Sequence, residues 1–284
     1  MPPKFTKFHG LGNDYLVIEA DQLTGIDYLG EFARRICNRH YGAGGDGIAI
    51  ISKSQSADAD FNCRIFNPDG SEAGLSGNGT RCAVAYLYYA GHWSGDELRL
   101  STRTGLKRYF PRGKDGAGKF IFESELGRPK FDSPSIPMSI SPPLDLVIGY
   151  ILPVAGQPVP ITALQMGNPN CCIFVDDFDA LNWRKLGKTI ETHPQFPDRT
   201  NVVFVRVRER ALIELRIWER GVGETTASGT CSCAGAVAAM INEKADRDVK
   251  VIMEGGEVRI HWRPDGEVVI TGTAELVYSG EWLA

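Results

Sequence analysis

Two segments of this chain each place a serine–glycine pair at the predicted start of a helix: SEAGLSGNGTRCAVAYLYYAG, residues 71–91, and GETTASGTCSCAGAVAAM, residues 223–240. A shift of 152 residues superimposes three pairs of residues: Ser76 and Ser228, Glu72 and Glu224, Gly77 and Gly229. The apolar runs CAVAYLYYA and CAGAVAAMI that follow are typical of buried helices. We therefore predict an α/β protein of the α+β type with two pseudo-symmetric domains, each a mixed or antiparallel sheet wrapped around a central helix.

The segments around these helices repeat the same order of strands in both halves. YLGEFARRICNRHY, residues 28–41, predicts a further helix with Tyr28, Phe32 and Ile36 on its apolar stripe. Five prolines after Gly127 prevent a helix and mark a change of organisation. We expect an N-terminal domain of residues 1–127, a C-terminal domain of residues 128–274, and a last strand, residues 275–284, that returns to the first domain.

The composition indicates a folded protein that acts on small molecules. With 284 residues, 43% hydrophobic and 23% charged, the chain can bury a large core. A net charge of -4 provides no broad basic surface for nucleic acid or for a membrane. No apolar stretch approaches the roughly 20 residues that span a bilayer, and we predict a cytoplasmic protein.

Neither the cysteines nor the glycine motifs indicate a metal or a cofactor. The seven cysteines include no C-x-x-C pair and the five histidines are dispersed, so we predict reduced thiols and no metal site. The segment GAGGDG, residues 42–47, matches G-x-G-x-x-G, but a dinucleotide site needs a strand before it and a helix after it. Here the order is reversed, and we expect no cofactor.

The two serine–glycine turns predict a carboxylate site with two reactive positions. A helix N-terminus presents unpaired N–H groups and a partial positive charge, which together bind anions. The two turns could converge on one carboxylate in a cleft between the domains, with one side chain on each face of the adjacent carbon. A racemase or epimerase requires this arrangement, because one group removes the α-proton and another delivers a proton to the opposite face.

A serine hydroxyl is poorly suited to proton transfer at these two positions. A thiol at a helix N-terminus can act as a base near neutral pH, whereas a serine hydroxyl stays protonated unless a neighbouring base activates it. The nearest local carboxylates are Glu72 and Glu224, four residues before each serine. Each is equally well interpreted as a structural turn residue.

Six ordered motifs resemble those of the diaminopimelate epimerase family: HGLGNDY, RIFNPDGSE, SGNGTRC, MGNPN, FPDRTNV and ERGVGETTASGT. The resemblance covers nearly the whole chain. It implies a cofactor-independent isomerase that interconverts LL- and meso-2,6-diaminopimelate in bacterial lysine and peptidoglycan synthesis. It also implies two α/β domains related by a pseudo-two-fold axis, usually in a homodimer, with the active site in the cleft between the domains.

The resemblance further implies which residues bind the substrate. Those expected at its distal amino-acid end are Asn13, Asn67, Asn168, Asn201, Glu219 and Arg220. Those expected to offer N–H groups to the carboxylate at the reacting centre are Gly77, Asn78, Gly229 and Thr230. Carboxylate and amide oxygens suit an ammonium group, and the arginine fork suits a carboxylate. For any single asparagine, a turn or cap role is equally open.

The chain departs from the family pattern at the catalytic positions. Two family cysteines transfer the protons, and here Ser76 and Ser228 occupy their places. Asn170 replaces a family histidine, and Cys231 stands at a family glycine, with a helix offset that predicts a thiol turned away from the cleft. Three interpretations stay open: an epimerase whose thiols were replaced to trap substrate, a natural epimerase or racemase with serines activated by other groups, and a silent protein that binds diaminopimelate or a similar amino acid.

Overall fold

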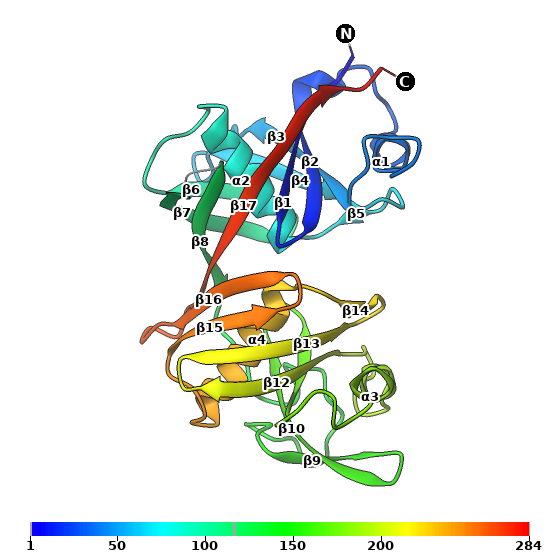
Figure 1. Ribbon diagram of the computed structural model, residues 1–284, viewed down its shortest axis with the longest axis vertical. Helices are drawn as coiled ribbons and strands as arrows, with labels where there is room; N and C mark the ends of the chain where they lie inside the picture. The colour runs from blue at the N-terminus through cyan, green and yellow to red at the C-terminus, as the bar shows by residue number, and fades with distance from the viewer. Residues whose placement is uncertain (1, 116–117, 284) are drawn as a thin grey trace. The chain divides into compact units, whose positions relative to one another are not determined.

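The computed structural model describes residues 2–115 and 118–283 and divides the chain into two compact units. Unit 1 comprises Met1–Ser124 and Thr271–Ala284, and unit 2 comprises Glu125–Ile270. The chain passes between the units within two strands, β8 (Lys119–Gly127) and β17 (Val268–Glu281) (Figure 1). No helix among the described residues is long and apolar enough to cross a bilayer.

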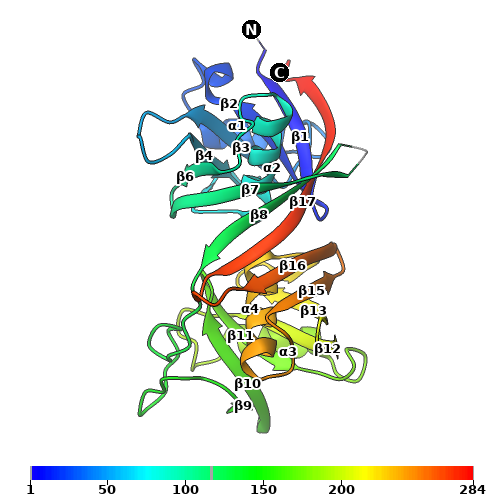
Figure 2. The same ribbon diagram turned by 90° about the vertical axis from the view of Figure 1, so that its left-hand side faces the viewer.

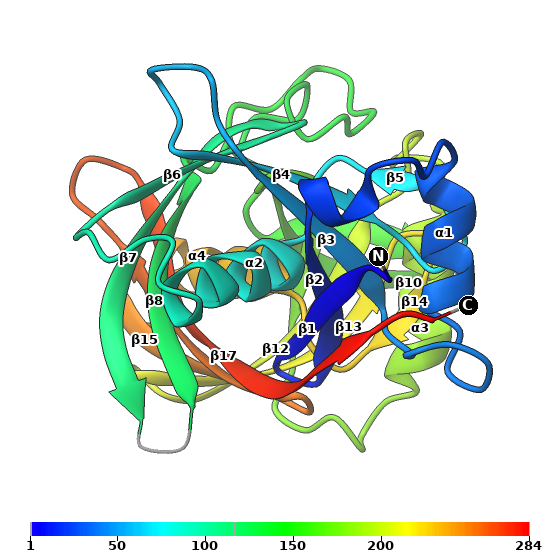
Figure 3. The ribbon, with the colours of Figure 1, turned by 90° about the horizontal axis from the view of Figure 1, so that it is seen from above.

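Unit 1 is a closed ring of strands around one helix. Its helical elements are η1 Ala20–Leu23, α1 Leu29–Ile36 and α2 Gly77–Tyr89. Its other strands are β1 Lys4–Gly10, β2 Asn13–Glu19, β3 Gly47–Lys53, β4 Phe61–Phe66, β5 Glu72–Ala73, β6 Leu98–Thr102 and β7 Gly105–Asp115. Neighbouring strands pair in the order β1–β2–β3–β4–β6–β7–β8–β17, and β17 pairs again with β1. Figure 3 shows α2 enclosed by these strands.

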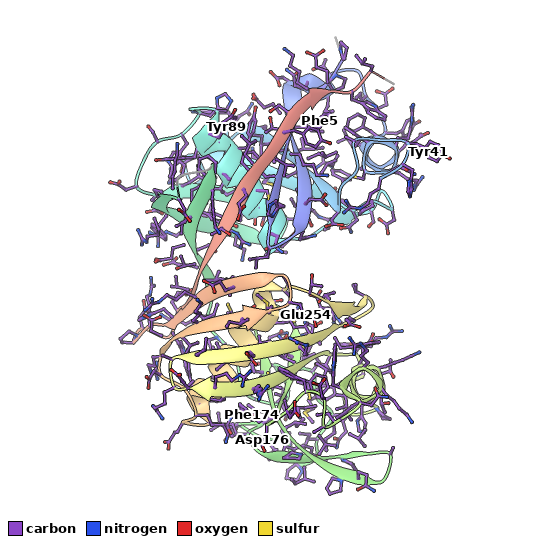
Figure 4. All side chains as sticks on the ribbon, viewed as in Figure 1. Phe5, Tyr41, Tyr89, Phe174, Asp176 and Glu254 are labelled. Carbon is purple, nitrogen blue, oxygen red and sulfur yellow. The ribbon has the colours of Figure 1, made fainter. Side chains whose placement is uncertain are left out.

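The helix α2 is buried on nearly all sides. Every residue from Asn78 to Ala85 is buried, as is Leu87. A helix that is apolar all round requires such an enclosure, which explains the unbroken run CAVAYLYYA. Phe5 on β1, labelled in Figure 4, lies where the ring of strands closes. Its aromatic ring packs edge-on against that of Tyr278 on β17, with the two centroids 5.8 Å apart.

Unit 2 repeats the plan around α4. Its helices are α3 Trp183–Glu191 and α4 Gly229–Ile241. Its other strands are β9 Tyr150–Val154, β10 Gln157–Gln165, β11 Pro169–Phe174, β12 Asn201–Glu209, β13 Leu212–Glu219, β14 Gly223–Thr225, β15 Asp248–Met253 and β16 Gly256–Trp262. They pair in the order β9–β10–β11–β12–β13–β15–β16, with β14 on β13. Figure 2 shows α4 among these strands, and residues 231–240 are all buried.

The two units share their strand pattern. The pairs β2–β3 and β11–β12 are both parallel, as are β4–β6 and β13–β15. The short hairpins that precede α2 and α4 have the same register, with Glu72 opposite Phe66 and Glu224 opposite Trp218. The predicted fold class, two related units that each wrap a sheet around a central helix, is confirmed.

The helix predicted over residues 28–41 is too long. The helix α1 ends at Ile36, and Asn38 Oδ1 then accepts hydrogen bonds from the N–H groups of His40 and Tyr41, each at 2.9 Å. An asparagine side chain that binds the backbone in this way competes with helical hydrogen bonds. Tyr28, predicted on the apolar stripe, lies before the first turn and is 75% exposed.

Candidate active site

Ser76 caps the buried helix α2. Its backbone is extended, with φ -132° and ψ 120°, and its Oγ accepts a hydrogen bond from the N–H of Gly79 at 3.0 Å. The N–H groups of Gly77 and Asn78 begin the helix and find no acceptor within residues 2–115 and 118–283. These two N–H groups are available to an anion at the positive end of the helix.

Ser76 has a second partner, Tyr15, which the sequence analysis did not identify. The Tyr15 hydroxyl donates a hydrogen bond to Ser76 Oγ at 2.9 Å. Tyr15 is 5% exposed, and burial raises its pKa, so that the phenol stays protonated and acts as the donor. Alternation along β2 directs Tyr15 and Val17 toward the core around α2, and Leu16 and Ile18 toward the core around α1. This period-2 pattern was the available signal for Tyr15.

Asn13 and Asn78 belong to one hydrogen-bond network beside Ser76. Asn78 Nδ2 donates to Asn13 Oδ1 at 3.2 Å, and Asn13 Nδ2 donates to Asp46 Oδ2 at 2.8 Å. Arg81, which is 3% exposed, donates to Asn78 Oδ1 at 2.5 Å and to the carbonyl of Thr273 at 2.8 Å. The network fixes the orientation of both side-chain amides.

Asn67 begins the turn between β4 and β5. Its N–H donates to the carbonyl of Ser71, and its Nδ2 donates to Ser71 Oγ, both at 2.9 Å. Its carbonyl accepts from Gly70 at 3.0 Å, just as the carbonyl of Glu219 accepts from Val222 at 3.1 Å in unit 2. Asn67 is therefore the counterpart of Glu219, but no hydrogen bond of the described residues connects it to Ser76.

Ser228 begins α4 with different partners. Its backbone is also extended, with φ -148° and ψ 125°, but its hydroxyl makes no hydrogen bond to the first turn of the helix. The 9%-exposed Ser228 instead lies beside the carboxylate of Glu219, to which Thr225 Oγ1 donates at 3.0 Å. Burial raises the pKa of Glu219, and the two hydroxyls offset part of this rise. The N–H groups of Gly229 and Thr230 open the helix beside them.

Three asparagines of unit 2 connect in series to the backbone of Arg220. Asn170 Nδ2 donates to the Asn168 carbonyl at 2.7 Å, Asn201 Nδ2 to Asn170 Oδ1 at 3.1 Å, and the Arg220 N–H to Asn201 Oδ1 at 2.9 Å. Asn170 and Asn201 face each other across the parallel pair β11–β12. The Arg220 guanidinium donates to the Asp198 carbonyl at 3.0 Å and makes no ion pair in the described part of the chain. Its other N–H groups are available to a carboxylate.

Cys231 contacts the other residues of this site. Its Sγ lies 3.6 Å from Asn170 Oδ1 and beside Ser228, so the thiol does not turn away from them. Burial raises the pKa of Cys231 well above its ordinary value and keeps the thiol protonated. Cys231 and Gly79 are both third residues of their helices, and a Cβ at Gly79 would lie 2.9 Å from the Tyr15 ring. In unit 1 the Tyr15 ring leaves no room for a side chain at Gly79. In unit 2 the corresponding third helical residue, Cys231, carries one.

The two local glutamates are structural. Glu72 binds the Arg64 guanidinium at 2.8 and 3.0 Å, and Glu224 binds the Arg184 guanidinium at 2.6 Å through both oxygens. These arginines lower the pKa of both carboxyl groups. Of the two interpretations of these residues, the structural one is supported for each, because a carboxylate bound by an arginine at both oxygens is a weak base.

The structure groups the predicted site residues by unit. Unit 1 connects Ser76, Gly77, Asn78 and Asn13, and unit 2 assembles Ser228, Gly229, Thr230, Glu219, Arg220, Asn201 and Asn168. No three His, Cys, Asp or Glu side chains of the described residues are arranged to hold a metal ion.

Comparison with known proteins identifies the family. The model of the diaminopimelate epimerase family matches residues 5–116 and 162–277. The chain belongs to this family. It is 41% identical over 280 residues to the diaminopimelate epimerase of Pelotomaculum thermopropionicum, with 98% of each chain covered, and 40% identical over 281 residues to that of Desulforudis audaxviator, with 99% of each covered. A Bacillus anthracis phenazine biosynthesis protein of the PhzF family covers 100% of both chains with a TM-score of 0.71 at 18% identity, which shows the shared fold alone.

The two departures that the family resemblance implies away from the serines are in contact in the structure, with Cys231 Sγ 3.6 Å from Asn170 Oδ1. The resemblance implies a larger histidine in place of Asn170 and a smaller glycine in place of Cys231. We interpret the pair as one compensated exchange, in which the thiol fills space that the smaller residue leaves. Volume-conserving exchanges of this kind are tolerated best in a packed interior.

We therefore predict that Asn170→His alone destabilises the protein by about 1–3 kcal/mol, because the imidazole overpacks against the thiol. Adding Cys231→Gly is expected to relieve this destabilisation. Urea unfolding of the native chain, the two single variants and the double variant measures the coupling between the two sites. Cys233→Gly is the matched control, since it removes a buried thiol of the same helix that makes no hydrogen bond to Asn170 among the described residues. Additive effects of the two substitutions would contradict the compensation.

Glu219→Gln is expected to raise the melting temperature near pH 7.5, with a gain that shrinks as the pH falls toward about 4. Burial raises the folded-state pKa of Glu219 above the ordinary 4.5, so that ionised Glu219 costs stability only at higher pH. Glu224→Gln is the control with the opposite sign: Arg184 lowers the pKa of Glu224, and this variant loses stability near neutral pH but not in acid. Calorimetric scans across the pH range measure both, and a Glu219→Gln effect that is independent of pH would refute the assignment.

Proposed function

We propose that this chain epimerises LL-2,6-diaminopimelate to meso-2,6-diaminopimelate by two-base α-proton transfer, as a step in lysine and peptidoglycan synthesis. Relatives that are 40–41% identical over nearly their whole length carry the name diaminopimelate epimerase. The observation that carries the proposal for this particular chain is the half-buried Glu219 carboxylate, which lies beside Ser228 and accepts a hydrogen bond from Thr225 Oγ1 at 3.0 Å. It supplies the neighbouring base that a serine needs in order to act in place of a thiol.

The acid–base step uses the two helix starts differently. As Ser228 Oγ removes the α-proton, the Ser228 proton moves to Glu219, whose raised pKa suits it to accept that proton. Ser76 delivers a proton to the opposite face of the same carbon. The negative charge that develops on the substrate carboxylate is stabilised by the free N–H groups of the two first helical turns.

The distal end of the substrate is assigned to the asparagines and Arg220. The Arg220 guanidinium has N–H groups to spare for the distal carboxylate. Asn13, Asn67, Asn168 and Asn201 are assigned to the remaining polar groups of that end. The family resemblance places Glu219 at the distal ammonium. Its carboxylate accepts a hydrogen bond from Thr225 Oγ1 and lies beside Ser228, and this supports the acid–base role instead.

The family resemblance also supports a cytoplasmic homodimer that acts on a small amino acid. The proposal includes no metal, no organic cofactor, no nucleic acid and no membrane partner. A silent diaminopimelate-binding protein is the second candidate, because hydroxyls stand where the family has thiols.

Exchange of the α-proton in heavy water tests the proposed reaction. The native chain, mixed with LL- or meso-diaminopimelate, is expected to remove the α-proton signal in a time course followed by proton NMR. Ser76→Cys/Ser228→Cys is expected to exchange at least about 100-fold faster, because thiols are the better acids and bases. Ser228→Ala is expected to abolish exchange while binding is retained.

Two other outcomes separate the alternatives. Measurable binding without exchange in the native chain, together with exchange in Ser76→Cys/Ser228→Cys, excludes turnover by the serines and leaves the trapped enzyme. Failure of both proteins to exchange shows that the pocket has diverged beyond the two side chains, and it supports the silent binder.

Arg220→Met is expected to weaken meso-diaminopimelate binding by roughly 10–100-fold in calorimetric titration, because charge-assisted hydrogen bonds to the distal carboxylate are lost. Arg220→Lys is expected to restore only part of the affinity, since lysine lacks the planar fork. Arg210→Met is the matched control, because Arg210 is an exposed arginine of the same unit that pairs with Asp246 at 2.8 Å. Unchanged affinity in Arg220→Met would remove Arg220 from the binding site.

A further inference from the structure

The ring of Tyr15 is fixed between two glycines. A Cβ at Gly47 on β3 would lie 2.7 Å from Tyr15 Cε1, and a Cβ at Gly79 on α2 would lie 2.9 Å from the same atom. Both distances are shorter than van der Waals contact, so any side chain at either position would displace the ring. The packing therefore places the phenol hydroxyl at a defined point next to the first turn of α2.

The Tyr15 hydroxyl provides one of the two hydrogen bonds that Ser76 Oγ accepts. Ser76 Oγ accepts hydrogen bonds from the Tyr15 hydroxyl at 2.9 Å and from the Gly79 N–H at 3.0 Å. A serine oxygen has two lone pairs and one hydrogen, so only the hydrogen remains for a third partner. Two donors on one oxygen also stabilise that oxygen when it loses its proton.

The second helix start lacks both of these donors. Ser228 makes no hydrogen bond to the first turn of α4, and it lies beside the carboxylate of Glu219 and the thiol of Cys231. Asn170 begins the β11–β12 pairing as Tyr15 begins the β2–β3 pairing, but its side chain binds Asn168 and accepts from Asn201. The environment of one serine therefore favours its anion, and that of the other favours removal of its proton.

We propose that Tyr15 is a positioning residue for the reaction: its hydroxyl orients Ser76 Oγ and stabilises the oxygen anion that remains when Ser76 gives its proton to the substrate. In the direction in which Ser76 protonates the substrate, Ser228 removes the α-proton, and in the reverse direction the two roles are exchanged. The role of Tyr15 in the reaction rests on the proposed function. The hydrogen bond between Tyr15 and Ser76, on which that role depends, can be measured without any substrate.

The test converts Ser76 into a thiol whose ionisation can be measured. All seven native cysteines are buried, whereas Ser76 is partly exposed, so iodoacetamide reacts selectively with the new thiol of Ser76→Cys. The alkylation rate as a function of pH gives its pKa. In Ser76→Cys/Tyr15→Phe the pKa is expected to rise by about one unit or more, because a donor to the thiolate is lost. The native chain measures the background reaction.

Tyr109→Phe in the Ser76→Cys background is the matched control. Tyr109 is buried and its hydroxyl also contacts α2, but at Thr80 Oγ1, 2.5 Å away, and not at Ser76. This variant is expected to leave the thiol pKa unchanged. An equal pKa in Ser76→Cys with and without Tyr15→Phe, or an equal rise with Tyr109→Phe, would overturn the proposal.

A stability cycle gives a second test that does not depend on the introduced thiol. Ser76→Ala leaves the buried Tyr15 hydroxyl without its acceptor, so Tyr15→Phe is expected to lower the melting temperature less in Ser76→Ala than in the native chain. Additive changes would also overturn the proposal. Neither experiment includes substrate, so their failure leaves the exchange test of the proposed function intact, and failure of that test leaves these results intact.

Discussion

Enclosure of one helix by a sheet is the constraint on which both units depend. A helix surrounded by strands can present backbone polar groups only at its ends, and the first-turn N–H groups must find partners there. In both units a hydroxyl on the fourth helical residue reinforces this end: Thr80 donates to the Ser76 carbonyl at 2.8 Å and Ser232 to the Ser228 carbonyl at 2.6 Å. The remaining N–H groups form the anion site that the proposed chemistry requires.

Small differences in packing make the two helix starts chemically unlike. In unit 1, the absence of a side chain at Gly79 admits the Tyr15 ring, whose hydroxyl reaches Ser76. In unit 2, the Cys231 thiol fills the corresponding position and contacts Asn170. The serine oxygen therefore accepts two hydrogen bonds in one unit and lies beside a carboxylate in the other. In the proposed reaction, these equivalent positions act as proton donor and proton acceptor.

Local signals in the sequence correctly predicted where each central helix begins, but they did not identify the groups around each helix start. Glu72 and Glu224 stand close to the serines along the chain, yet their carboxylates bind Arg64 and Arg184, which are eight and 40 residues away. Tyr15, which does reach Ser76, is 61 residues away. Proximity along the chain did not decide between the two interpretations of these glutamates, because the partner of a strand residue depends on how the strands pair.

The amino-acid sequence alone was sufficient for the fold class, the family and the two helix starts, because apolar periodicity, capping residues and motif order are properties of contiguous residues. The environment of each serine depended on three-dimensional packing. Strand register brings Asn170 opposite Asn201 from 31 residues away, and the glycine contacts of Tyr15 place its hydroxyl at Ser76. Such contacts follow from how the strands pair and how closely the helix approaches them, which no single segment of the chain encodes.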